Sequence, residues 1–197
     1  MQRETVVRVI LGALLLISAF LNVLQARHIR EISDNISAAN PQILQIGSSL
    51  AAIEAKDLSG REVKVGYRDS RLPTVVYVFS PSCGWCERNS ANVRALVSQA
   101  KSNYRFIGLS LTSDGLSNYV ETHNFSIPTY SDPSNATRTQ YRLSSTPTTL
   151  VIAPSGKLLK IWAGAYLGTT RADIEHFFSV RLPDPGELGA TRALKLE

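Results

Sequence analysis

The chain contains two cysteines among its 197 residues, Cys83 and Cys86, three positions apart in the sequence Cys-Gly-Trp-Cys. They follow an apolar, β-branched run at residues 74–79 and precede a stretch with helical character at residues 87–101. Two thiols on such a strand-to-helix turn can close a small disulfide ring and reopen it. The N-terminus of a helix favours the thiolate form of a nearby cysteine. The pattern therefore favours exchange of an electron pair with a disulfide or dithiol of another protein.

Zinc binding is the alternative use of two close thiols. A structural zinc site needs four ligands, and the cysteines would supply two of them. The histidines are His28, His123 and His176, and no two of them have the spacing of a ligand pair. A purely structural disulfide is also a poor explanation, because so short a ring constrains the unfolded chain little. We therefore expect a redox-active pair, with no metal and no other cofactor.

The composition is that of a globular protein, with 44% hydrophobic and 19% charged residues. The formal net charge is +5 and the isoelectric point is about 9.4. The basic residues are scattered and form no stripe interleaved with aromatic residues, so nucleic-acid binding is not expected. The length allows one ordinary domain with extensions.

The N-terminal segment contains an uncharged apolar run at residues 9–24. With its flanks it reaches the roughly 20 residues that a membrane-spanning helix needs. We therefore predict that residues 1–26 form a cytoplasmic start and a membrane anchor. The alternative is a cleaved signal peptide, but Leu24 fits a small-residue cleavage site poorly.

The orientation of the anchor is decided by the expected chemistry, since basic residues are nearly balanced on its two sides. Disulfides are formed and corrected outside the cytoplasm. We expect a single-pass protein of the cytoplasmic (inner) membrane, with its catalytic domain on the periplasmic or extracytoplasmic side. Residues 27–45 are predicted to form a helical stalk, and a homodimer through this stalk is an alternative to a simple spacer. Residues 183–197 are predicted to form a flexible C-terminal tail.

The central part of the chain, residues 46–182, predicts one α/β domain. Asp114, Asp132 or Ser134, and Thr170 are expected to cap its later helices. The expected order is strands 52–55, 62–65 and 75–79, a helix to residue 100, strand 104–111, a helix to residue 123, an extended piece 127–130, a helix at 134–141, strands 148–153 and 158–163, and a helix to residue 178. This order implies a mixed central sheet flanked by helices.

Three stretches together resemble the thioredoxin superfamily, specifically its membrane-anchored TlpA/ResA-like, or redoxin, branch. Residues 46–63 are similar to the lead-in hairpin of that branch. Residues 76–86 contain the Cys-x-x-Cys motif, and residues 145–157 contain a Thr-Pro pair before an apolar strand and a turn. A Cys-x-x-Cys motif alone is a weak signal, but this combination is specific. The resemblance covers residues 46–182 and implies a thioredoxin fold with an N-terminal hairpin extension.

The resemblance also implies roles for individual residues. Cys83 attacks the partner, and Cys86, one turn further into the helix and more buried, resolves the mixed disulfide. Pro147 is expected to be cis and to pack against the disulfide, leaving the backbone of Thr146 free to pair with a substrate strand. Trp85 is expected to be exposed, where it can contact a partner.

Two positions depart from the family pattern. Tyr77 stands six residues before the first cysteine, where thioredoxins usually carry an acid. The proton of Cys86 must then use another group, a water molecule or Tyr77 itself. Glu87 stands where relatives often have a basic residue, and we interpret it as a solvated acid favoured by the helix dipole.

The function that these observations predict is a membrane-tethered thiol-disulfide oxidoreductase that reduces protein disulfides outside the cytoplasm, as in cytochrome c maturation, with a separate membrane protein as electron donor. One alternative is a redoxin-type thiol peroxidase. Peroxidases of the related family carry a Pro-x-x-x-Thr-x-x-Cys loop, and here Val76 and Ser80 stand at the Pro and Thr positions. The other alternative is a non-enzymatic copper or thiol carrier.

Overall fold

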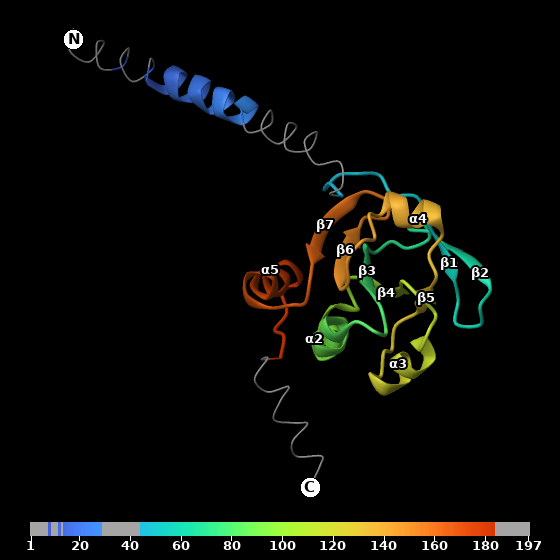
Figure 1. Ribbon diagram of the computed structural model, residues 1–197. Coiled ribbons are helices and arrows are strands. Elements are labelled where there is room, and N and C mark those ends of the chain that lie inside the picture. Colours follow the sequence, from blue (N-terminus) through green and yellow to red (C-terminus); the bar gives the residue numbers. More distant parts are fainter. Residues whose placement is uncertain (1–7, 9–11, 13, 29–43, 184–197) are drawn as a thin grey trace. The chain divides into compact units, whose positions relative to one another are not determined.

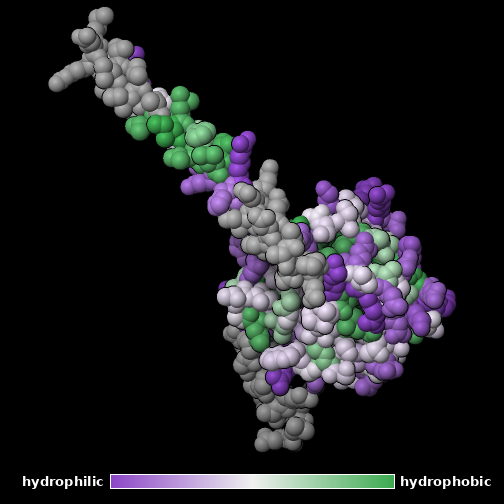
Figure 2. Space-filling view, turned by 45° about the horizontal axis from the view of Figure 1, so that its top comes forward, coloured by the Kyte–Doolittle hydropathy of each residue, from purple (hydrophilic) through white to green (hydrophobic). Residues whose placement is uncertain are grey.

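The computed structural model describes residues 8, 12, 14–28 and 44–183. The chain divides into two units, residues 1–43 and residues 44–197. In the first unit, residues 14–28 form a helix whose side chains are exposed and, from residue 14 to 24, mostly apolar (Figure 2). Among the residues described, no helix combines the length and the hydropathy needed to cross a membrane. The predicted anchor lies partly, and the predicted stalk and tail almost wholly, outside the described residues.

The second unit is organised by a mixed sheet of seven strands between residues 44 and 183, in the order β2-β1-β5-β4-β3-β6-β7 (Figure 1). The strands are β1 (Ile53–Lys56), β2 (Glu62–Val65), β3 (Thr74–Phe79), β4 (Arg105–Ser110), β5 (Thr129–Ser131), β6 (Thr148–Ile152) and β7 (Leu158–Ala163). The helices of this part are α2 (Gly84–Ala100), α3 (Leu116–Thr122), α4 (Asn135–Gln140) and α5 (Gly168–Phe178). The α/β thioredoxin-like architecture and the N-terminal hairpin that the sequence predicts are therefore present.

Strand β3 is the central strand that positions the cysteines. All six of its residues are buried, and it pairs in parallel with β4 and antiparallel with β6. Its side chains alternate between two cores. Tyr77 and Phe79 join a cluster that includes residues of α2, α3 and α5, whereas Val76 and Val78 join a cluster on the other side. Burial on both faces explains the uninterrupted apolar run of this strand.

The helix starts are where the sequence predictions were partly wrong. Ser134 caps α4, as predicted, and accepts a hydrogen bond from the backbone N–H of Thr137. Asp114 does not cap α3, because Gly115 takes the N-cap position in a left-handed conformation. Thr170 does not cap α5, because that helix begins at Gly168 and places Thr170 inside its first turn. The predicted strands agree with the observed ones within about two residues at each end.

The β1–β2 hairpin closes through a turn that is held by one carboxylate. Asp57 Oδ1 accepts hydrogen bonds from the Ser59 hydroxyl at 2.6 Å and from the backbone N–H groups of Ser59 and Arg61 at 2.9 and 3.0 Å. These donors, with the Ser59 hydroxyl first, lower the pKa of Asp57 from 3.8 to about 2. The charged form of Asp57 therefore stabilises the folded hairpin.

We expect the stabilisation from Asp57 to disappear on acidification. Because its folded-state pKa is depressed, the contribution is complete above pH 3.8, the unfolded value, and is lost as the pH falls through about 2. The measurement is the difference in free energy of unfolding between the wild type and Asp57→Asn from pH 6 to pH ~2. The difference should shrink across the acidic end of that range, and a constant difference would contradict this reading of the turn.

The turn between β6 and β7 is packed against the segment that precedes β1. Gly156 has a φ of +84°, and a Cβ there would lie 2.8 Å from the carbonyl oxygen of Leu50. The two residues are also joined by a hydrogen bond of 2.8 Å from the Leu50 N–H to the Gly156 carbonyl. Only glycine fits this position, because both the backbone conformation and the close approach exclude a side chain.

The substitution Gly156→Ala is expected to lower the free energy of unfolding by about 2 kcal/mol or more. Gly60→Ala is the matched control, since Gly60 has the same φ of +84° but no atom within 4 Å of a Cβ. The control should cost only about 1 kcal/mol, from backbone strain alone. Urea unfolding of both variants checks the difference, and equal losses would show that the Leu50 contact is unimportant.

Candidate redox site

Cys83 forms the N-cap of α2, immediately after the loop that leaves β3. Its Sγ accepts a hydrogen bond of 3.1 Å from the backbone N–H of Cys86, and its own N–H donates to the Ser80 carbonyl at 3.0 Å. The side chain thus occupies the place that Ser or Thr takes at many helix starts. The free N–H groups and the helix dipole at this end favour a thiolate once the pair is reduced.

The two cysteines form a disulfide, with their Cα atoms 5.2 Å apart. Cys83 is half-buried, whereas Cys86 is completely buried. This confirms the predicted difference in exposure. A partner disulfide can therefore reach Cys83 but not Cys86.

The segment before β6 lies against this disulfide. The Thr146–Pro147 peptide bond is cis, as the resemblance implies. The Cys83 Sγ lies 3.6 Å from the carbonyl oxygen of Thr146, although the two residues are 63 positions apart in the chain. The antiparallel pairing of β3 with β6 produces this meeting, because β3 leads into Cys83 and β6 begins just after Pro147. The cysteines and the Thr-Pro pair are thus brought together in one site.

Trp85 is exposed, as expected, with 52% of its surface accessible. Its neighbour Arg88, which was not among the predicted site residues, has its Cζ 4.9 Å from the centre of the indole ring. This is a cation–π contact. Residues three apart on a helix lie side by side, so the spacing of Trp85 and Arg88 in the sequence could have predicted it. Arg88 covers part of the indole and adds a positive charge beside the cysteines.

Tyr77 lies in the buried core that also contains Cys86. Burial raises the pKa of Tyr77 well above its usual value, and the nearby Tyr166 adds to this effect. Its hydroxyl accepts a hydrogen bond of 3.4 Å from the Asn89 side chain. Because the phenol stays protonated near neutral pH, Tyr77 does not replace the missing acid as a base. Glu87 is exposed, in agreement with a solvated first-turn acid.

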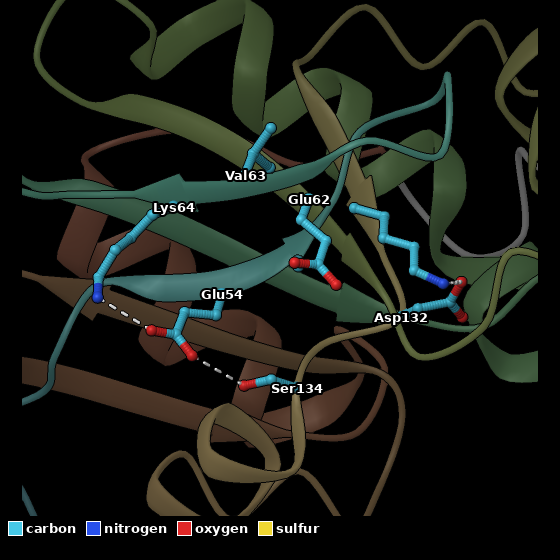
Figure 3. A pocket seen from close by; sticks show the side chains of 8 residues that line it. Glu54, Glu62, Val63, Lys64, Asp132 and Ser134 are labelled. Atoms are coloured by element: carbon cyan, nitrogen blue, oxygen red, sulfur yellow. Dashed lines mark hydrogen bonds and ion pairs between the residues drawn. The ribbon is translucent and has the colours of Figure 1, made fainter.

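Among the surface hollows of the described part of this unit, two bear on the location of the site. One of about 440 Å³ is lined by Pro81, Ser82, Glu87 and residues from 114 to 123, so it adjoins the cysteine loop. The other, of about 370 Å³, lies over the β1–β2 hairpin and contains no cysteine (Figure 3).

Four of the five charged side chains that line the hairpin hollow are paired with one another. Figure 3 shows Glu54 between Lys64 and Ser134. The Glu54 Oε1 lies 2.9 Å from the Lys64 Nζ. Lys56 and Asp132 are 3.9 Å apart on the other side. We therefore place the functional site at the cysteines. Among the described residues, no group of three or more His, Cys, Asp or Glu side chains is arranged to hold a metal ion.

Comparison with known families assigns the domain to a protein family. Residues 46–161 match the model of the AhpC/TSA family, which is more than half of the chain. The chain belongs to the AhpC/TSA family. A relative of this AhpC/TSA chain, a "Thioredoxin-like protein" of Haemophilus influenzae, is 25% identical over 115 residues. That alignment covers 57% of this chain and 66% of the relative, just under two thirds of its length.

Solved structures agree with the fold of this AhpC/TSA domain. The thioredoxin domain of a thiol-disulfide oxidoreductase from Bacteroides vulgatus has a TM-score of 0.56 and 18% identity, covering 69% of this chain and 99% of its own. A thiol-disulfide oxidoreductase from Bacteroides fragilis has a TM-score of 0.55 and 17% identity, covering 66% and 99%. A secreted disulfide oxidoreductase of Mycobacterium tuberculosis, homologous to DsbE of E. coli, has a TM-score of 0.52 and 15% identity, covering 64% and 93%. These similarities establish the thioredoxin fold.

Proposed function

We propose that the protein is a thiol-disulfide oxidoreductase that exchanges electron pairs with other proteins through Cys83 and Cys86. The observation that carries this proposal is the position of Cys83, at the N-terminus of α2 with its Sγ 3.6 Å from the Thr146 carbonyl. A thiolate is favoured at that place, and a partner backbone can align along Thr146 next to it. The names of the structural neighbours, which include three disulfide or thiol-disulfide oxidoreductases, support the same chemistry.

The reaction proceeds in two exchanges when the protein acts as a reductant. The Cys83 thiolate attacks one sulfur of the partner disulfide, the partner S–S bond breaks, and its other sulfur leaves as a thiolate that takes up a proton. The Cys86 thiol then gives up its proton and attacks Cys83, which releases the second partner thiol. One electron pair has passed to the partner, and the Cys83–Cys86 disulfide has formed.

The direct test is reduction of insulin disulfides by the purified chain with dithiothreitol as electron source. We expect catalysed precipitation of the insulin B chain at a rate well above that of dithiothreitol alone. The redox potential decides the direction, since thioredoxin-like reductants have potentials of about −270 mV and strong oxidants of about −120 mV. We propose a reductase of the cytochrome c maturation type, so the expected potential is close to the first value. A potential close to the second value would assign the chain to disulfide formation instead.

We also propose that the chain is tethered to the cytoplasmic membrane with its redox domain outside the cytoplasm, served by a separate membrane electron donor. The uncharged run at residues 9–24 supports an anchor, and the secreted mycobacterial neighbour supports the location. Labelling of Cys83 in intact cells by a membrane-impermeant thiol reagent tests the location. Labelling only after lysis would contradict it.

A thiol peroxidase is the second candidate, because the AhpC/TSA family match includes the cysteine region. The geometry of β3 argues against it. Val76, at the position of the peroxidase proline, is fully buried in the middle of β3 and pairs with both β4 and β6. It cannot form part of a peroxide-binding loop there. Rapid consumption of hydrogen peroxide by the reduced chain would restore this candidate.

A further inference from the structure

Helix α2 carries two buried amide side chains behind the cysteines. Asn89 and Asn92 are 1% and 2% exposed, and they lie three and six residues beyond Cys86. Burying an amide is costly unless it is hydrogen bonded. Among the described residues, the Asn92 Oδ1 has no hydrogen-bond partner, whereas both polar atoms of Asn89 are engaged. The Asn92 Nδ2 donates to the Asn89 Oδ1 at 3.3 Å, so Asn89 is the connected centre of this buried pair.

Asn89 connects α2 to the segment between β7 and α5. Its Oδ1 accepts a hydrogen bond of 3.0 Å from the backbone N–H of Tyr166, and its Nδ2 donates to the Tyr77 hydroxyl at 3.4 Å. Tyr166 is buried and lies outside the strands and helices. Its N–H is thus a buried donor away from regular structure, and Asn89 supplies the acceptor that such a group requires.

The same segment is attached to the strand that follows the cis-proline. The Gly164 N–H donates to the Pro147 carbonyl at 2.8 Å. The Tyr166 hydroxyl is 2.7 Å from the hydroxyl of Thr149, two residues further along. Residues 164–166 therefore form a bridge, held to the start of β6 at two points and to the cysteine helix at Asn89.

We propose that Asn89 is a positioning residue, which fixes the Thr146–Pro147 segment relative to Cys83 through residues 164–166. It touches neither cysteine through a hydrogen bond, so its effect is on the alignment of the partner backbone beside Cys83 and not on the thiol chemistry. This inference rests on the proposed function, because it requires that partner proteins bind along Thr146.

The test compares Asn89→Leu with Ser90→Ala, a control at a neighbouring buried polar residue of α2 that takes part in none of the hydrogen bonds described above. Each reduced variant reacts with insulin and with dipyridyl disulfide, a small molecule that needs no main-chain pairing. We expect Asn89→Leu to lose about tenfold in kcat/KM toward insulin, mainly through a higher KM, and to change less than about twofold toward the small disulfide. Ser90→Ala should stay within about twofold of the wild type for both substrates.

A second variant keeps the test decisive if Asn89→Leu does not fold. Tyr166→Phe removes only the hydroxyl bound to Thr149, leaves α2 intact, and should lose about threefold toward insulin alone. Equal losses toward both substrates, or an unchanged rate with insulin, would overturn the inference. A wild-type chain that reacts with dipyridyl disulfide but never with insulin would overturn the proposed function itself, and the inference with it.

Discussion

Replacing Cys83 with serine is expected to abolish insulin reduction, with a loss on the order of 10³-fold or more. The attacking group in disulfide exchange is a thiolate, and a serine hydroxyl does not ionise near neutral pH. The variant should fold normally, because Cys83 is the N-cap of α2 and serine is among the residues preferred there. Its hydroxyl can accept the hydrogen bond that the Cys83 Sγ now accepts from the Cys86 N–H.

The control for Cys83→Ser is the far-ultraviolet circular dichroism and the unfolding midpoint, which should remain close to those of the reduced wild type. Insulin reduction that survives the substitution, at more than a few per cent of the wild-type rate, would show that Cys83 is not the attacking thiol.

Replacing Cys86 has the opposite consequence, because the first exchange remains and the second is blocked. We expect Cys86→Ala to accumulate a covalent mixed disulfide between Cys83 and the partner, with turnover reduced on the order of 10²-fold or more. Alanine is the better choice at this position, since Cys86 is fully buried and a serine hydroxyl would need a new partner. Non-reducing electrophoresis of cells that express the variant, followed by mass spectrometry, measures the adducts and identifies the partners.

The matched variant for the trapping experiment is the double substitution Cys83→Ser with Cys86→Ala, which should form no adduct. Adducts that persist in the double variant would be unrelated to this site, since no other cysteine exists in the chain. Adducts confined to cytoplasmic proteins would contradict the proposed location while leaving the exchange chemistry intact.

The sequence predicted the scaffold of the site well, because the scaffold depends on local patterns. The apolar run of β3 predicts a strand buried on both faces, and the Cys-x-x-Cys motif after it predicts the strand-to-helix turn. The cis state of Pro147 came from the family resemblance, since a proline in a sequence does not reveal its isomer.

The connections behind the cysteines could not be predicted, because they depend on tertiary packing. Nothing in the sequence links Asn89 with Tyr166, which are 77 positions apart. The caps expected at Asp114 and Thr170 failed for a related reason. Gly115, directly after Asp114, and Gly168, two residues before Thr170, allow the chain to start each helix elsewhere. The cation–π contact of Arg88 with Trp85 was accessible from helical spacing and was overlooked.

The structure argues against Tyr77 as the group that takes the proton of Cys86. Tyr77 stands at the position of the usual acid, but its burial keeps the hydroxyl protonated, and the hydroxyl accepts a hydrogen bond from Asn89. A substitution to phenylalanine at this position therefore removes no base. The proton that Cys86 releases must leave by another route, such as a water molecule or a group of the bound partner.

A single turnover tests whether Cys83 and Cys86 transfer an electron pair to a partner disulfide. The fully reduced chain is mixed with one equivalent of insulin, quenched with acid, alkylated and analysed by mass spectrometry. We expect each newly formed Cys83–Cys86 disulfide to be matched by one reduced disulfide of insulin. A reduced chain that keeps both thiols while insulin remains oxidised, at a potential where transfer is favourable, would contradict it.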